Sequence, residues 1–170
     1  MIIDDAKNSL ALLRSEISEE TRVKSKDDLH VGDILSLEMD EKDGLKLRGK
    51  YKTRNKFIVV IGINSKGDAI GALLINSEID YTKDTPELKP YQYPMNQEKY
   101  PEILDYDSWL DCTDLFLLKS RKIIAKKAEL KCKVQVDDFH KVIGLVRDYE
   151  GIDKHIKVKY GIIQKKNDKP

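Results

Sequence analysis

A long apolar passage at residues 57–77, with the sequence FIVVIGINSKGDAIGALLINS, constrains the fold more than any other part of the chain. Residues 57–63 form a nearly unbroken apolar run that is rich in β-branched residues, and residues 69–75 form a second apolar run. Two short runs that are separated by a turn containing Gly67 indicate a β-hairpin. Because neither run alternates cleanly, we expect both strands to be buried on both faces, at the centre of a small sheet or barrel.

Further strands are expected on both sides of this hairpin. Residues 29–39 and 108–118 are apolar segments of strand length, and Ile123-Ile124 is expected to continue the second of them. Residues 128–134 and 156–162 alternate with period two, which predicts two half-exposed strands.

Two helices are predicted near the ends of the chain. Residues 1–20 carry one apolar stripe with alternating spacings of three and four, formed by Ile3, Ala6, Leu10, Leu13 and Ile17. A second helix is expected from Asp137, as its N-cap, to about Tyr149. The stripe of the first helix must pack on its own domain, on a second copy of the chain or on a different partner.

These elements predict a mainly β fold with helices, of the α+β class, built as a small, partly open barrel with helices packed against it. The chain has 170 residues, which is enough for one core. We expect an N-terminal helical extension over 1–20, a single barrel domain over 29–163 with a long loop at 78–107, and a tail at 164–170.

Composition restricts the partners and the compartment. Lys and Arg total 31 against 30 acidic residues, so overall charge does not favour nucleic acid, although a local basic patch remains open. Cys112 and Cys132 fit no metal-ligand spacing and are expected to be reduced thiols, which indicates a cytoplasmic protein. No apolar run approaches the roughly 20 residues that span a bilayer, so no membrane partner is expected.

Two polar segments flank the hairpin. Residues 40–55 carry Lys or Arg at six positions and form either a solvated loop or a ligand or nucleic-acid contact. Residues 78–107 contain four prolines and five tyrosines, which predicts an extended surface loop. Its tyrosines either cover the barrel or stack on unpaired bases.

The order of the segments GDILSL, RNKFIVVIG, GALLINS, DSWLDCTDL and VQVDDFHKVIGLVRDYEGI resembles the MazF/PemK/Kid-like toxins, over about residues 30–152. The resemblance implies an SH3-like barrel that is often a homodimer. It also implies an enzyme that cuts single-stranded RNA without a metal or cofactor and that a cognate antitoxin protein inhibits.

The same resemblance implies a set of site residues. The family has an Arg-Pro pair before the strand that follows the first loop, where this chain has Lys56-Phe57 with Arg54 upstream. The implied catalytic residues are Arg54, Lys56, Ser77 and Asp111. The implied RNA-binding residues are Arg48, Lys50, Lys52 and Asn76.

RNA cleavage of this kind uses the 2′-OH as nucleophile, so it needs a base and a group that stabilises the added negative charge. Arg54 or Lys56 can supply the charge, and Asp111 can act as the base if burial raises its pKa. The alternative bases are His30, His140 and His155, although each is expected to be structural or merely exposed. No motif of a Ser-His-Asp triad, a zinc site, a phosphate-binding loop or a dinucleotide fold is present.

Three functions fit these observations. The first is the endoribonuclease toxin. The second is a non-catalytic SH3-like barrel that binds a protein partner or nucleic acid, which the missing Arg-Pro pair and the extra helix at 1–20 favour. The third is a barrel whose ligand is a small molecule.

Overall fold

The computed structural model of the chain describes residues 2–47, 49–75 and 85–165. Its helices and strands are, in chain order, α1 (Ile2–Thr21), β1 (Asp33–Asp40), β2 (Thr53–Ile63), β3 (Ala69–Ile75), β4 (Gln92–Met95), β5 (Ser108–Leu118), α2 (Ser120–Ala125), β6 (Glu129–Lys133), α3 (Val136–Asp148) and α4 (Lys154–Lys159). Short 3-10 turns lie at η1 (Lys26–Asp28), η2 (Glu41–Asp43) and η3 (Lys89–Tyr91).

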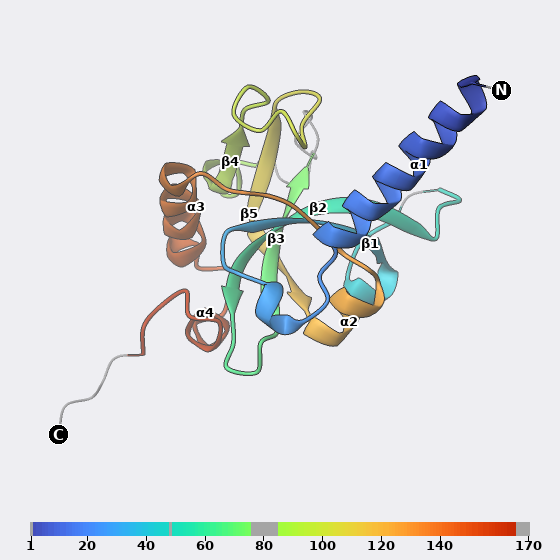
Figure 1. Cartoon of the computed structure of the whole chain (residues 1–170). Coiled ribbons are helices and arrows are strands. Elements are labelled where there is room, and N and C mark those ends of the chain that lie inside the picture. Colours follow the sequence, from blue (N-terminus) through green and yellow to red (C-terminus); the bar gives the residue numbers. More distant parts are fainter. Residues whose placement is uncertain (1, 48, 76–84, 166–170) are drawn as a thin grey trace.

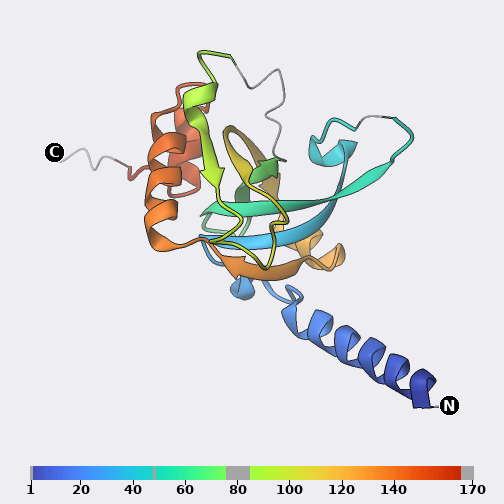
Figure 2. The ribbon, with the colours of Figure 1, turned by 90° about the horizontal axis from the view of Figure 1, so that it is seen from above.

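The six strands form one antiparallel sheet in the order β4-β5-β3-β2-β1-β6. The sheet curls into a partly open barrel, with helices around it (Figure 1; Figure 2). The predicted hairpin is its central pair, β2 and β3. Each residue from Ile58 to Ile61 is at most 1% exposed, which confirms that β2 is covered on both faces.

Each face of the sheet carries its own apolar core. On the face that carries Ile58, here called the Ile58 face, the core includes Ile123 of α2. On the opposite face, here called the Val59 face, it includes Val142 and Val146 of α3. The α+β class and the partly open barrel with helices are therefore confirmed, and the C-terminal helix packs on the Val59 face.

The predicted surface loop contains an edge strand, β4, which among the described residues pairs only with β5. Pro94 lies within it, and a proline is tolerated there because an edge strand leaves one row of backbone groups unpaired. Tyr100 is 2% exposed and belongs to the core of the Val59 face. Tyr100 therefore covers the barrel and is not available to stack on an unpaired base.

Two predicted strand segments are helical instead. Residues 156–162 fall mostly in α4, because Asp153 caps that helix by accepting a hydrogen bond from His155 N at 2.6 Å. Ile123-Ile124 lies in α2 and does not extend β5, because Asp68 Oδ1 accepts hydrogen bonds from both Ser120 N and Ser120 Oγ at the start of that helix. In the first case a local cap outweighs the period-two pattern, and in the second a distant carboxylate outweighs the apolar character of the segment.

Helix α1 points away from the barrel and meets it near β6 (Figure 1; Figure 2). Leu10 and Leu13 are 55% and 53% exposed, so the expectation that this stripe packs on its own domain is not met there. Packing on a second copy or on another partner remains the expectation for these side chains. Within the described residues, no helix combines the length and the apolar character that crossing a bilayer requires.

Candidate functional site

The first half of β2 brings two of the predicted catalytic residues together. Arg54 pairs with Met39 and Lys56 pairs with Leu37, and the register between β1 and β2 is unbroken over this stretch. Residues two apart on a regular strand point to the same side, so both cations lie on the Ile58 face. Arg54 is exposed, whereas Lys56 is half-buried.

The position of Lys56 changes its acid–base behaviour. Burial, and secondly the charge of Arg54, lower the pKa of the Lys56 ammonium below its usual range. Within the described part of the chain, no carboxylate forms an ion pair with either cation. The pair therefore offers a fixed positive charge next to an amine that loses its proton more easily than an ordinary lysine.

Asp111 lies on the same face, but β3 separates its strand from β2. Paired residues on neighbouring strands lie on the same face, so Leu73, which pairs with Ile58, is on the Ile58 face, and so is Ile75, two residues later on β3. Ile75 pairs with Trp109, and Asp111 lies two residues after Trp109 on β5, on that same face. The structure thus places Asp111 on the same face of the sheet as Lys56 but not beside it.

The carboxylate of Asp111 is 5% exposed and is held inside the sheet. Its Oδ1 accepts hydrogen bonds from Gln92 Nε2 at 2.9 Å, Thr113 N at 3.0 Å and Thr113 Oγ1 at 2.6 Å. These contacts join edge strand β4 to β5. They favour a positioning role for Asp111 over the predicted role of general base.

Gln92 adds an unexplained polar atom to this region. It is 4% exposed, and its Oε1 is buried without a hydrogen-bond partner, while its Nε2 is used by Asp111. Buried amide oxygens are rarely left unpaired in folded proteins. Sequence reasoning missed this residue, because nothing in the local pattern of Tyr91-Gln92-Tyr93 indicates burial.

The predicted RNA-binding residues stand just before β2. Lys50 and Lys52 are exposed, and Tyr51 between them is 69% exposed. An exposed aromatic ring between two lysines can stack on a base while the lysines contact phosphates. Tyr51 was not among the predicted site residues, although this interleaving was available in the sequence.

Three predicted site residues, Arg48, Asn76 and Ser77, lie outside the described residues. The structure therefore tests neither the serine nor the asparagine at the end of the central hairpin. What it does describe is that β3 ends at Ile75 beside the β2 segment that carries Lys56.

A small pocket lies at the same end of the sheet, but on the Val59 face, opposite the face that carries Lys56. Its volume is about 110 Å³, and Phe57, Leu74, Ile103, Leu104 and Tyr106 supply most of its lining. Asp105 and Ser108 complete the lining, which is therefore of mixed polar and apolar character.

The histidines do not contribute to this site. His140 and His155 are exposed on α3 and α4, and the side chain of His30 is 64% exposed, with its Nδ1 3.8 Å from Asp33. This agrees with the expectation that they are structural or merely exposed. Among the described residues, no group of three or more His, Cys, Asp or Glu side chains is arranged to hold a metal ion.

Comparison with known proteins gives no family for the chain. No family model matches it, and no curated protein matches it either.

Proposed function

We propose that the chain is a MazF/PemK-like endoribonuclease that cuts single-stranded RNA without a metal and that an antitoxin protein inhibits. The observation that carries the proposal is the pair Arg54 and Lys56, two cations on one face at the end of the central hairpin, one of them half-buried. A lysine that loses its proton easily beside a permanent positive charge suits a reaction in which a phosphate gains negative charge.

The two side chains take different parts in the proposed reaction. The guanidinium of Arg54 binds two non-bridging oxygens of the scissile phosphate and stabilises the charge that develops on them. Lys56, in its neutral form, accepts the proton of the 2′-OH. The O2′–P bond forms, the P–O5′ bond breaks, and the leaving 5′ oxygen takes a proton from water. The products are a 2′,3′-cyclic phosphate and a 5′-hydroxyl.

The surroundings supply contacts for the rest of the RNA. Tyr51 stacks on a base, and Lys50 and Lys52 bind phosphates upstream of the scissile bond. Asp111 keeps β4 and β5 together behind this surface.

The deciding experiment incubates the purified full-length chain with mixed-sequence RNA in excess chelator and maps the ends. We expect discrete cuts that leave 2′,3′-cyclic phosphates. Lys56→Met removes the proton acceptor and should lower the cleavage rate about 100-fold or more, the usual contribution of an acid–base group. The matched control is Lys141→Met, an exposed lysine on α3, which should cut like the parent.

The pH dependence provides a second readout. Because the neutral amine of Lys56 is the acceptor, the cleavage rate should rise with pH and level off above its lowered pKa. Cleavage that Lys56→Met and Arg54→Ala both leave at the parental rate would show that the site is elsewhere.

The alternative function is a non-catalytic barrel that binds nucleic acid or a protein partner. The hydrogen bonds of Asp111 favour it, because they hold inside the sheet the carboxylate that the family resemblance implied as a base. Intact RNA that is nevertheless bound by a folded chain would select this function. The homodimer is part of the first proposal, and the molar mass in solution tests it.

A further inference from the structure

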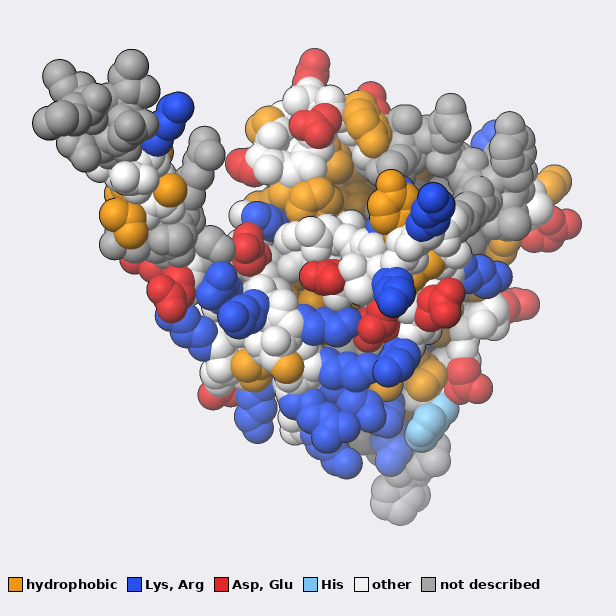
Figure 3. Space-filling model, turned by 90° about the vertical axis from the view of Figure 1, so that its right-hand side faces the viewer, with side chains coloured by type: hydrophobic (Ala, Val, Ile, Leu, Met, Phe, Trp, Pro, Cys, Tyr) orange, Lys and Arg blue, Asp and Glu red, His pale blue; other side chains and the backbone are white. Residues whose placement is uncertain are grey.

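Exposed basic side chains gather around α2, whose start is tied to the turn between β2 and β3. The basic surface consists of Lys66, Lys119, Arg121 and Lys127, all of which are exposed. Figure 3 shows Lys and Arg side chains clustered in the lower part of the side of the molecule on which α2 lies. The chain as a whole carries a net charge of only +1, so this concentration is local.

Contacts between two segments distant in sequence bring these residues together. Asp68 Oδ1 accepts hydrogen bonds from Ser120 N at 3.0 Å and from Ser120 Oγ at 3.3 Å. These bonds tie the turn between β2 and β3, which carries Lys66, to the start of α2. Lys119 and Arg121 flank Ser120 directly.

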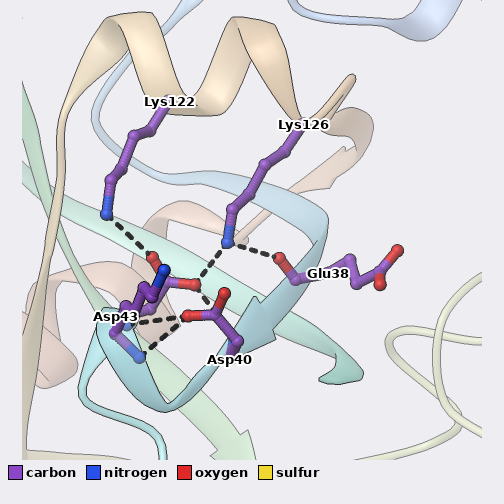
Figure 4. A network of polar contacts seen from close by, with 6 residues as sticks. Glu38, Asp40, Asp43, Lys122 and Lys126 are labelled. Carbon is purple, nitrogen blue, oxygen red and sulfur yellow. Dashed lines mark hydrogen bonds and ion pairs between the residues drawn. The ribbon is translucent and has the colours of Figure 1, made fainter. Parts of the chain in front are cut away.

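The other two lysines of α2 hold the helix in place. Lys122 donates to Asp43 Oδ1 at 3.4 Å, and Lys126 donates to Asp43 Oδ2 and, at 3.0 Å, to the carbonyl oxygen of Glu38 (Figure 4). Asp43 is itself fixed, because its Oδ2 accepts a hydrogen bond from Asp40 N at 3.0 Å. One carboxylate therefore serves two lysines, and α2 stays attached to the turn after β1.

This arrangement leaves the basic surface without acidic partners. None of Lys66, Lys119, Arg121 or Lys127 forms an ion pair with a carboxylate in the described part of the chain. Concentrated, unpaired positive charge attracts a polyanion and raises its rate of association. The remaining question is which polyanion fits.

The apolar residues of α2 exclude a lipid surface and argue against a protein partner. Ile123 is 1% exposed and Ile124 packs against the core of the Ile58 face, so the helix has no free apolar face to insert into a bilayer. A protein interface needs an apolar centre that this surface also lacks. Phosphate groups, in contrast, need only cations, which position a nucleic acid without reading its bases.

We propose that the basic surface binds the phosphate backbone of single-stranded RNA at a distance from the site of cleavage. The choice of RNA rests on the proposed function. Measured along β2, the path from Lys56 to Ile63 is about 23 Å at 3.3 Å per residue, so an RNA must extend well beyond the scissile phosphate to reach Lys66 and the start of α2. The end of α2 lies closer, at Glu38, the strand partner of Asn55. The surface therefore strengthens binding of long RNA, adds no sequence preference and takes no part in the chemistry.

The test compares two variants of equal net charge. The patch variant carries Lys119→Glu, Arg121→Glu and Lys127→Glu. The control variant carries Lys141→Glu, Lys154→Glu and Lys165→Glu, which are exposed residues beyond α2. Binding of fluorescent 12- and 40-nucleotide RNAs of mixed sequence is measured by anisotropy across a salt series, with circular dichroism as the check on folding.

We expect the patch variant to bind the 40-nucleotide RNA at least about tenfold more weakly than the control at low salt, with a log–log salt slope reduced by about 2, since each lost phosphate contact removes about 0.7. Binding of the 12-nucleotide RNA should change much less. In cleavage assays the patch variant should show a raised KM for long RNA at an unchanged kcat.

Failure of this inference is distinguishable from failure of the proposed function. If the two folded variants have equal affinities for RNA and equal salt slopes, the basic surface does not bind RNA, whether or not the chain cuts RNA. If the patch variant binds RNA more weakly than the control variant but the parent chain does not cut RNA, the inference about the basic surface is supported and the proposed nuclease function is refuted. If the patch variant binds vesicles that contain anionic lipid more weakly than the control variant does, while the two variants bind RNA equally, the surface binds lipid and the inference is overturned.

Discussion

Replacing Asp138 by Asn should destabilise the fold much more than the same change one residue earlier. Asp138 is 4% exposed in the first turn of α3. Its Oδ1 accepts from Tyr93 Oη at 2.5 Å, its Oδ2 accepts from Tyr100 Oη at 2.5 Å, and Lys99 Nζ lies 3.3 Å from Oδ1. One carboxylate thus joins α3 to β4 and to the segment that follows β4.

The magnitude follows from the bonds that are lost. A hydrogen bond to a charged group contributes about 1.5–3 kcal/mol, and Asn keeps one acceptor oxygen but loses the charge and the second acceptor. The expected loss is about 2–3 kcal/mol in the free energy of unfolding, against a total of about 5–15 kcal/mol for a domain. Urea unfolding measures it through the fluorescence of Trp109, the chain's single tryptophan.

Asp137→Asn is the matched control, because Asp137 is exposed in the same helical turn. It should change the free energy of unfolding by no more than about 0.5 kcal/mol. Equal losses in the two variants, or a loss below about 1 kcal/mol for Asp138→Asn at an unchanged m-value, would refute the reasoning.

The same carboxylate gives the stability a defined pH dependence. Burial by itself raises the pKa of Asp138. Hydrogen bonds from Tyr100, Tyr93 and Lys99 outweigh this effect and hold the pKa below its usual range. A lowered pKa in the folded state adds stability that is fully present above the unfolded pKa of about 4 and is lost as the pH falls through the folded pKa. The stability difference between the parent and Asp138→Asn should therefore narrow below about pH 4.

Two further perturbations test the packing of the termini. Lys157 is 5% exposed and its Nζ donates to two carbonyl oxygens at the end of α3, at 2.8 and 2.7 Å, so Lys157→Met should cost about 2 kcal/mol in urea unfolding. Lys154→Met, at an exposed position of the same helix, should cost almost nothing, and equal effects would contradict the assignment. Deletion of residues 1–20 should leave the unfolding midpoint of the barrel nearly unchanged, because Leu10 and Leu13 are exposed. A change on deletion from the molar mass of two chains to that of one chain would show that α1 joins two copies.

The elements that could be predicted from the sequence are those that local patterns determine. The central hairpin, strand β5 and helix α3 carry uninterrupted or periodic apolar residues, and each occupies the predicted place. The segments α2 and α4 could not be predicted in this way. The start of α2 depends on Asp68, 52 positions away, and α4 buries Lys157, which the alternating pattern assigns to an exposed face.

In the candidate site, too, the features that local spacing determines could be predicted, and those that depend on other segments could not. That Arg54 and Lys56 share a face follows from their spacing of two on one strand, and the continuous register confirms it. The half-burial of Lys56 and the hydrogen bonds of Asp111 depend on neighbouring strands, so the sequence contains no signal for them. A role for a carboxylate is consequently harder to predict than its position, because its partners, such as Gln92, come from other segments.

Lys56 differs from other charged side chains that are buried or half-buried. Asp33 is bound by Lys133 at 3.1 Å, Asp138 by two tyrosines and Asp43 by two lysines, whereas Lys56, within the described residues, has a second cation as its neighbour. A half-buried charge without a partner lowers stability, and proteins retain such residues mainly where function requires them. The variant Lys56→Met should therefore unfold at a higher urea concentration, with a gain of about 0.5–2 kcal/mol, while it loses RNA cleavage. A variant that is both less stable and fully active would show that Lys56 serves the fold and that the catalytic group lies elsewhere.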